Sequence, residues 1–474
     1  MKILWKEDKF DEINIKISFV KENDPFSKRL KEYKNIGLFE GKSGQVIMDL
    51  KDGVMNYYIG LGNEIDIDSF SLRKAFDKGF KKINLKGNIC IDLDIDFGIE
   101  RDVALVILTE MLILSTYKFD YFKSDKKDID NLNLLFIGYD DREKQIIEEG
   151  ISVGEACNIN RYLVDMPANV MTPLRLGKEV SDLGDENGFE VTLYDETQIS
   201  DMGMTAFLAV SSASINSPCF MVMKYCHPDM VTKPSVGLVG KGLCYDAGGL
   251  SIKPTTSMVN MKTDMGGAAA VIGTMVALAK QKAKVNVVSV VAACENLISG
   301  KGYRPGDIIK SKGGKTIFVG NTDAEGRLTL IDAMSYIIDE EKVSKVVDVA
   351  TLTGAAIHCT GNVATPCISN NDDFFRKLEK NGEKNGERYF RLPIYPEYKE
   401  QIKHGLADLN NQAGHPGTIT AGLFVGAYVK EDMPWLHLDI AGTCSKTKAM
   451  PKPVEVATGV ATATLYSLVK EVAI

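Results

Sequence analysis

Near-continuous apolar runs alternate with longer helical stretches through the second half of the chain. The runs SVGLVGKG, VNVVSVVAAC, KVVDVATLTG and WLHLDIAGT lack polar alternation, which is typical of parallel strands buried on both faces. Between them lie GGAAAVIGTMVALAKQ and LTLIDAMSYIIDEE, each long enough for a crossover helix. The pattern predicts an α/β domain built on a mostly parallel sheet.

The first half shows the same alternation in shorter pieces. Strand-like runs such as INIKISF, QVIMDL and MNYYIGLG alternate with charged helical stretches such as SFSLRKAFDKGFKK, and a lysine- and aspartate-rich piece at 121–133 precedes the strand LLFIGYD. The segment 141–167 keeps helical spacing and stops at Pro167, which predicts a connecting helix. Because 474 residues exceed what one core usually holds, we expect two α/β domains, residues 1–150 and 151–474, each a mostly parallel sheet flanked by helices.

Composition narrows the class of protein. A net charge of −8 and a pI near 5.4 argue against a general nucleic-acid binder. The most apolar segment, VALVILTEMLILST (103–116), is too short to cross a bilayer and carries Glu110, so it predicts a buried helix. The N-terminus turns charged before a signal-peptide core could form, and the nine cysteines form no C-x-x-C pair. We expect a cytoplasmic protein that does not contact membranes, and the acidic balance argues against nucleic acid as a partner.

The segment NTDAEGRL (321–328) follows the apolar run TIFVG. If it is extended, its period of two points Asp323, Glu325 and Arg327 in one direction. Two carboxylates facing one spot repel each other unless a cation lies between them. The alternative is a solvated turn, because Asn, Asp and Gly are turn formers.

Further polar residues follow other predicted strands. GKGLCYDAGGLSIKP (240–254) carries Lys241 and Lys253, and MKTDMGGAAA (261–270) places an aspartate before a helix start, where it could be an N-cap. Either lysine alone could be a solvated side chain. Four carboxylates at strand ends of one sheet are harder to explain as surface groups: Asp246, Asp264, Asp323 and Glu325. The five histidines show no ligand spacing, so a metal site here would use hard oxygen ligands, which suit Mg²⁺ or Mn²⁺ and also hold Zn²⁺.

These segments, with DVATLTGA (348–355), resemble in order the signature blocks of the leucyl aminopeptidase family, the M17 dizinc cytosol aminopeptidases. Weaker similarity extends from roughly 155 to 465. The first domain offers no motif, but its size suits the variable, non-catalytic N-terminal domain of that family. The resemblance implies a metal-dependent aminopeptidase that removes the N-terminal residue, Leu or another mostly apolar one, from peptides with a free N-terminus.

The resemblance also implies a role for individual residues. Asp246 and Glu325 would bridge two divalent metals (Zn²⁺ or Mn²⁺, with Mg²⁺ or Co²⁺ as alternatives). Asp323 would complete one metal site, and Lys241 with Asp264 the other, where the substrate amine also binds. The other implied roles are catalysis for Lys253 and Arg327, and lining of the pocket for the first side chain by Met261, Asn321, Thr351, Leu352 and Gly354.

Physical chemistry agrees with these implied roles. A lysine binds metal only when neutral, and two adjacent dications would lower the pKa of Lys241. Lys253, as a point charge, can stabilise the oxyanion of a tetrahedral intermediate. Arg327 stays protonated, and its planar fork suits a bound bicarbonate, which in the family accepts the proton of the attacking water. The family also assembles as a homohexamer, a dimer of trimers, with its active sites facing an inner cavity.

Three positions depart from the family pattern. Ala247 replaces a usual serine, Phe318 stands where glutamate is common, and His415 stands where small residues are common, which we expect to alter the pocket rim. None removes an implied ligand, so we expect activity. Two other hypotheses remain at this point: a different two-metal hydrolase such as a phosphoesterase, and a family member acting as a DNA-binding regulator.

Overall fold

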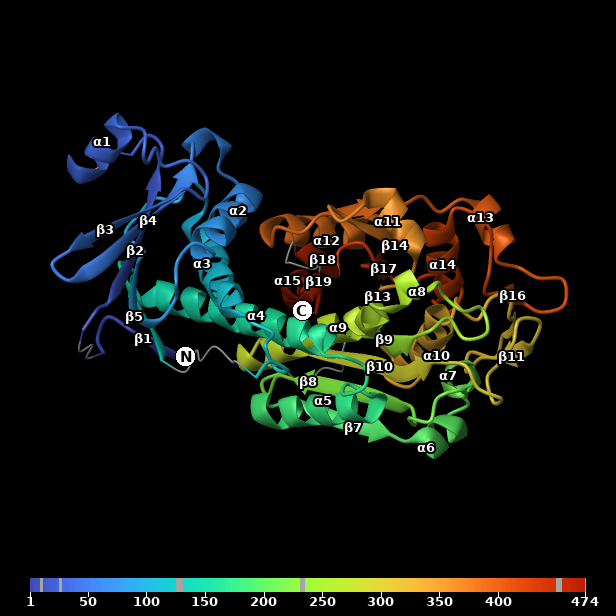
Figure 1. The fold of residues 1–474 in the computed structure, drawn as a ribbon. Helices are drawn as coiled ribbons and strands as arrows, with labels where there is room; N and C mark the ends of the chain where they lie inside the picture. The colour runs from blue at the N-terminus through green and yellow to red at the C-terminus, as the bar shows by residue number, and fades with distance from the viewer. Residues whose placement is uncertain (9–11, 25–27, 125–130, 231–234, 449–453, 474) are drawn as a thin grey trace. The chain divides into compact units, whose positions relative to one another are not determined.

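The computed structural model describes residues 1–8, 12–24, 28–124, 131–230, 235–448 and 454–473 (Figure 1). The chain divides into an N-terminal unit, Met1–Glu155 with Glu383–Gly386, and a C-terminal unit, Ala156–Gly382 with Glu387–Ile474. The predicted boundary at residue 150 falls inside helix α4 (Asp141–Asp165), the connecting helix expected from the sequence. Of the charged piece at 121–133, residues 125–130 lie outside the described residues.

A six-stranded sheet organises the N-terminal unit, in the order β1-β6-β5-β2-β4-β3. Its neighbouring strands are parallel except for the antiparallel pair β3 and β4. The strands are β1 (Lys2–Leu4), β2 (Ile15–Lys21), β3 (Val46–Lys51), β4 (Val54–Gly62), β5 (Gly87–Asp92) and β6 (Leu132–Ile137). The accompanying helices are α1 (Lys28–Asn35), η1 (Glu64–Asp66), α2 (Ser69–Phe80) and α3 (Arg101–Thr116).

Helix α3 is the apolar segment that the sequence predicts as a buried helix. Its Leu105 and Leu108 are fully buried, and they share one core cluster with Leu72 of α2. The single charge in this segment, Glu110, accepts a hydrogen bond of 2.9 Å from Arg73. This pairing explains how a nearly buried carboxylate is tolerated there.

An eight-stranded sheet organises the C-terminal unit, in the order β15-β14-β17-β13-β9-β10-β8-β7. The strands are β7 (Glu190–Tyr194), β8 (Cys219–Cys226), β9 (Val236–Asp246), β10 (Asn286–Asn296), β13 (Lys345–Ala350), β14 (Thr365–Ser369), β15 (Tyr389–Arg391) and β17 (Trp435–Asp439). The four central strands, β17, β13, β9 and β10, are parallel and correspond to the four apolar runs. The predicted fold class is confirmed: both units are α/β with mostly parallel sheets.

Helices cover both faces of this sheet, as crossover connections require. A Cβ added at Gly237 of β9 would meet Ile337 of α10 (Gly326–Asp339), whereas one at Gly240 would lie 2.7 Å from the Cα of Ala268 in α9 (Gly266–Lys280). The two glycines therefore let helices approach β9 closely from opposite sides. The remaining helices are α5 (Pro173–Asn187), α6 (Glu196–Asp201), α7 (Thr205–Ser211), α8 (Thr255–Met258), η2 (Met261–Met265), α11 (Gly354–Thr360), α12 (Asp372–Lys384), α13 (Pro396–Gln401), α14 (Gly417–Gly426) and α15 (Thr462–Val472).

Two small sheets complete the described part of the unit. One contains β11 (Ile308–Lys310), β12 (Thr316–Phe318) and β16 (Leu409–Asn410), and the other pairs β18 (Ser445–Lys448) with β19 (Val454–Ala457). The expectation that TIFVG belongs to the main sheet is wrong, since β12 pairs with β11 and β16 instead. Within the described ranges, no helix combines the length and apolar character needed to cross a bilayer.

Candidate metal centre

A β-bulge brings two of the predicted residues to one face of β9. Lys241 and Asp246 are five positions apart, so a regular strand would point them to opposite faces. Opposite them, however, β10 advances only from Ala292 to Asn296, because Cys244 of β9 has no partner in the register. The extra residue reverses the alternation, and both side chains turn toward the same side.

The loop after β9 returns Lys253 to the end of the strand. Gly248 and Gly249 have φ angles of 88° and 63°, which favour glycine, and a Cβ on Gly248 would lie 2.8 Å from Oδ1 of Asp323. The Lys253 ammonium consequently lies 2.7 Å from Oδ2 of Asp246 and also pairs with Asp323. This lysine thus lies between the carboxylate that ends β9 and one from the turn before α10.

The NTDAEGRL segment is a turn followed by a helix, so the extended alternation considered from the sequence is wrong. Asn321 closes the turn by accepting a hydrogen bond of 2.7 Å from the backbone N–H of Asp323. Glu325 is the N-cap of α10 with helical angles (φ −78°, ψ −38°), and Arg327 lies in the first turn of that helix. A Cβ on Gly326 would overlap the side chain of Lys241, which explains why α10 begins with glycine.

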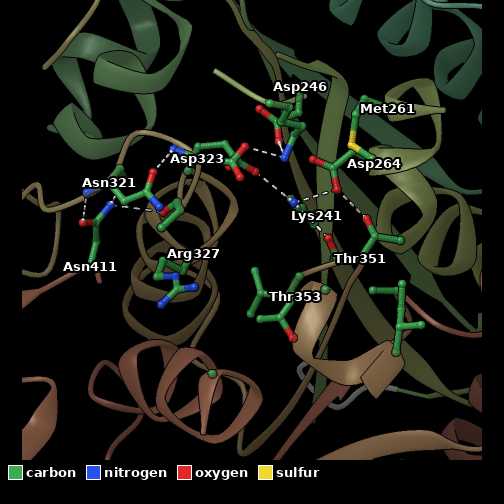
Figure 2. A pocket seen from close by; sticks show the side chains of 18 of the residues that line it. Lys241, Asp246, Met261, Asp264, Asn321, Asp323, Arg327, Thr351, Thr353 and Asn411 are labelled. Atoms are coloured by element: carbon green, nitrogen blue, oxygen red, sulfur yellow. Dashed lines mark hydrogen bonds and ion pairs between the residues drawn. The ribbon is translucent and has the colours of Figure 1, made fainter. Parts of the chain in front are cut away.

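Asp264 comes from the short helix η2, and the alternative that it caps α9 is wrong. The N-cap of α9 is Met265, and no side chain caps it. Asp264 instead accepts hydrogen bonds at Oδ1 from Lys241 Nζ (2.7 Å) and Thr351 Oγ1 (2.8 Å). Its Oδ2 is buried and has no hydrogen-bond partner in the described structure. Its side chain is thus turned into the interior (Figure 2).

All twelve residues proposed from the sequence line a single cavity of about 320 Å³. They are Lys241, Asp246, Lys253, Met261, Asp264, Asn321, Asp323, Glu325, Arg327, Thr351, Leu352 and Gly354. Figure 2 shows Lys241 with the side chains of Asp246, Asp264 and Asp323 turned toward it. Residues from β9, η2, the start of α10 and the end of β13 therefore meet at one place.

The carboxylates are close enough to share a metal. Asp246, Asp323 and Glu325 each offer an oxygen within 4.8 Å of the others. Among the described residues, no other three His, Cys, Asp or Glu side chains are close enough to hold one metal ion. Asp264 adds an unpartnered buried oxygen, and all four supply hard oxygen donors. Lys241 Nζ lies between Asp264 and Glu325, 3.0 Å from the latter. The donor set therefore fits a pair of divalent cations.

Charges in the cluster are strongly perturbed. Burial, together with the Glu325 charge, raises the pKa of Asp246 to about 7. Burial also raises the pKa of Asp264 well above its ordinary value. Burial alone would lower the pKa of Lys241, but Asp264 and Glu325 outweigh it and the net shift is upward. Without metal the cluster thus retains protons that a divalent cation would displace.

Arg327 is half-buried, and its Nε atom has no hydrogen-bond partner in the part of the chain that is described. Burial lowers its pKa to about 10, against the opposing charges of Glu325 and Asp439. The guanidinium therefore stays protonated at neutral pH. An unpartnered, protonated planar fork at a cavity wall is suited to an anion with paired oxygens.

Several polar residues that hold the loops were not identified from the sequence. Asn296 donates to Asp246 Oδ1 (2.7 Å), and Thr322 Oγ1 donates to the carbonyl of Gly248 (2.7 Å). Asn411 bonds the NTDAEGRL backbone, and Asp439 bonds the backbone after β13. Of these, only Asp439 could have been identified from the sequence, because it follows an apolar run, as several of the predicted site residues do.

The departures from the family pattern leave the donor set intact. The Ala247 backbone is held by Asn296 and Lys253 (2.8 and 3.0 Å), so the missing serine hydroxyl is not needed to keep the loop closed. Phe318 stacks on the ring of His404 with centroids 4.0 Å apart. His415 is exposed and does not line the cavity, so the expected change of the pocket rim does not come from direct contact.

Family models match both parts of the chain. Residues 158–466 match the catalytic domain of the cytosol aminopeptidase family, and residues 18–126 match its N-terminal domain. The chain belongs to this family. Its relatives include probable cytosol aminopeptidases of Clostridium perfringens, 42% identical over 97% of this chain and 93% of that protein, and of Treponema denticola, 42% identical over 93% and 94%.

Solved structures of family-like proteins have the same fold. A manganese complex of the bottromycin maturation enzyme BotP has a TM-score of 0.89 at 27% identity, covering 98% of this chain and all (100%) of that one. A mutant of tomato leucine aminopeptidase has a TM-score of 0.87 at 31% identity, covering 99% and 96%. The prediction of a metal-dependent aminopeptidase, a hydrolase of this family, is confirmed, and the regulatory and phosphoesterase alternatives are not favoured.

Proposed function

We propose that this chain removes single residues from the free N-terminus of peptides with the aid of two divalent metal ions held in the 320 Å³ cavity. The observation that carries the proposal is the convergence there of four carboxylates and a buried lysine. Asp246 and Glu325 would bridge the metals, Asp323 would complete one site, and Lys241 with Asp264 would complete the other. When bound, such a metal pair activates water and polarises a carbonyl group.

Lys253 and Arg327 supply positive charge beside the metal ligands. Burial opposes the charge of Lys253, but Asp246 and Glu325 outweigh it and raise its pKa, so the ammonium persists at neutral pH. A fixed ammonium at that position stabilises the oxyanion that develops on the scissile carbonyl oxygen. The Arg327 fork would hold a bicarbonate ion, whose oxygen accepts the proton released by the attacking water.

The cavity also accounts for selection of the first residue. The substrate's α-amine would bind the metal held by Lys241 and Asp264, and the unpartnered Oδ2 of Asp264 supports this assignment. Met261, Thr351, Leu352 and Gly354 offer uncharged walls for the first side chain, which favours Leu and other apolar residues. Asn321 lines the same cavity, although its side-chain oxygen is used in the turn.

Metal identity, assembly and location complete the proposal. Zn²⁺ or Mn²⁺ is favoured, with Mg²⁺ or Co²⁺ as substitutes, and the manganese complex of BotP supports the inclusion of Mn²⁺. We further propose a homohexamer in the cytosol. The family description supports the location, and the nine cysteines, none in a disulfide, agree with it.

The test is hydrolysis of aminoacyl amides by metal-stripped protein, with each of the four cations added back separately. We expect no turnover without metal, restored turnover with Zn²⁺, Mn²⁺ or Co²⁺, and no cleavage of N-acetylated peptides, since acylation removes the amine. Full activity in verified metal-free protein, or efficient cleavage of a blocked peptide, would overturn the proposal. A phosphate monoester and a labelled DNA duplex serve as controls for the two alternatives.

A further inference from the structure

Asp439, at the end of β17, is a fully buried carboxylate to which the proposed reaction gives no role. In the sheet it lies beside Ala350, the last residue of β13. Its Oδ1 accepts hydrogen bonds from the backbone N–H groups of Leu352 (3.1 Å), Thr353 (3.4 Å) and Ala441 (3.2 Å). Its Oδ2 accepts one from the Thr353 hydroxyl (2.7 Å). One carboxylate thus fixes the start of the segment that leaves β13.

That segment, Thr351–Gly354, connects the metal ligands with the pocket for the first side chain. The Thr351 carbonyl accepts a hydrogen bond of 3.0 Å from Lys241 Nζ, and the Thr351 hydroxyl donates one of 2.8 Å to Asp264. Figure 2 shows Thr351 beside these two side chains, with Thr353 on the same segment. A displacement of the segment would therefore move ligand partners and pocket wall together.

We propose that Asp439 is a positioning residue that holds the Thr351–Gly354 segment in place for metal binding and for selection of the first residue. The assignment rests on the proposed metal site. Asp439 itself does not line the cavity and so acts through the segment. Partners that orient ligands in this way typically contribute about 10–100-fold to metal affinity or activity.

The test compares Asp439→Asn with Asp332→Asn. Asp332 is a matched control, because it is also fully buried and also accepts backbone N–H bonds, here from Phe207 (2.9 Å) and Lys312 (2.8 Å). It does not line the cavity. Asparagine keeps the shape of each side chain but replaces one acceptor oxygen by a donor. The measurements are metal content after dialysis against a weak chelator, KM and kcat for leucyl and smaller aminoacyl amides, and thermal unfolding.

We expect Asp439→Asn to lower metal retention on the Lys241 and Asp264 side and to raise KM, with a combined effect of about 10–100-fold. Asp332→Asn should change thermal unfolding while leaving metal retention and KM within about twofold, since the two sites share no partner. If Asp439→Asn proves poorly folded, Thr353→Val removes the hydroxyl that bonds Asp439. The same hydroxyl caps α11 at Ala356 and contacts Thr418, so thermal unfolding of this variant is measured as well. Thr353→Ser, which keeps that hydroxyl, should behave nearly as the wild type.

The possible outcomes separate this inference from the proposed function. A wild-type protein that binds no divalent metal would refute the metal site itself. The positioning role alone would be refuted if the wild type binds metal but Asp439→Asn has the same metal retention and KM as Asp332→Asn. The same holds if Thr353→Val has the same metal retention and KM as Thr353→Ser. A loss of stability in Asp439→Asn without a change in metal retention or KM would also overturn it, because a purely structural carboxylate predicts that result.

Discussion

Replacing Asn411 with alanine would remove the main support of the NTDAEGRL turn. Asn411 is fully buried, and its amide forms four hydrogen bonds with that segment and with the residue before it, Gly320. Its oxygen accepts from the N–H groups of Gly320 (2.8 Å) and Asn321 (3.3 Å), and its nitrogen donates to the carbonyls of Asn321 (2.7 Å) and Ala324 (3.3 Å). Alanine can make none of these bonds.

The expected cost follows from the geometry of the four bonds. The two short ones contribute about 1 kcal/mol each, and the two at 3.3 Å contribute less because they are long. Leaving the Gly320 N–H without a partner adds about 1 kcal/mol, at the lower end of the usual range because Gly320 is only half-buried. The Asn321 carbonyl keeps its hydrogen bond from the Ala324 N–H (3.3 Å). The free energy of unfolding should fall by about 3 kcal/mol.

The turn also carries Asp323 and Glu325, so the variant should lose metal affinity as well as stability. Urea unfolding with and without metal separates the two effects, because a bound metal stabilises the folded state according to its affinity. We expect the metal-dependent part of the stability to shrink in Asn411→Ala, together with a metal affinity lower by about 10–100-fold.

Asn370→Ala is the matched control. Asn370 likewise bridges backbone groups, those of Met433 and Trp435, both at 2.9 Å. It follows β14 and bonds the start of β17, and it does not line the metal cavity. It should lose some stability and keep the full metal-dependent increment. An Asn411→Ala protein with wild-type metal affinity would show that the turn holds its shape without this amide, and would refute the reasoning.

Three further predictions concern the ligands and the assembly. Glu325→Ala should lose metal and activity together. Arg327→Ala should keep its metal by elemental analysis while turnover falls about 10²–10⁴-fold, and Arg327→Lys should restore little of that turnover. Metal loss in Arg327→Ala would contradict these assignments. Because nearby carboxylates raise the pKa of Lys241, metal-free protein carries that proton at neutral pH, so metal binding should release protons and strengthen as pH rises. Calorimetry in two buffers of different ionisation enthalpy tests this, and a pH-independent affinity would contradict it. Light scattering at micromolar concentration should give a hexamer, and a fully active monomer would count against it.

The fold and the membership of the site were predictable because both follow from short-range patterns. Apolar runs without alternation predicted the four parallel strands, and Asp246 lies at the end of β9, with Lys241 on the same strand, as that pattern indicates. Asp323 and Glu325 reach the same place after β12, a strand of a separate small sheet. The resemblance to a known family then added the five residues lining the pocket. These site residues could be predicted from the sequence because each lies in or directly beside a segment with a recognisable pattern.

The local geometry was not predictable in the same way. The bulge at Cys244 depends on how β9 pairs with β10, and neither strand's own pattern contains that register. NTDAEGRL was compatible with an extended segment and with a turn, and the contacts of Asn411, which is 90 residues from Asn321, hold the turn. An asparagine in a loop has many local uses, so its sequence context does not reveal a partner so far away.

The arrangement of the two lysines indicates that the site forms before metal binds. Lys241 pairs with Asp264 and Glu325, and Lys253 pairs with Asp246 and Asp323, so each ammonium lies between two of the four carboxylates. These ion pairs, with the raised carboxyl pKa values, reduce the repulsion that would otherwise open the cluster. Chelation should therefore abolish activity while the far-ultraviolet circular dichroism spectrum keeps its folded form. Replacing both lysines with methionine should instead destabilise the fold of the metal-free protein at neutral pH. Acid should restore its stability, because protonation of the carboxylates removes the unpaired charges. A metal-free wild type that unfolds, or a metal-free double variant as stable as the wild type, would show that the lysines do not hold the cluster together.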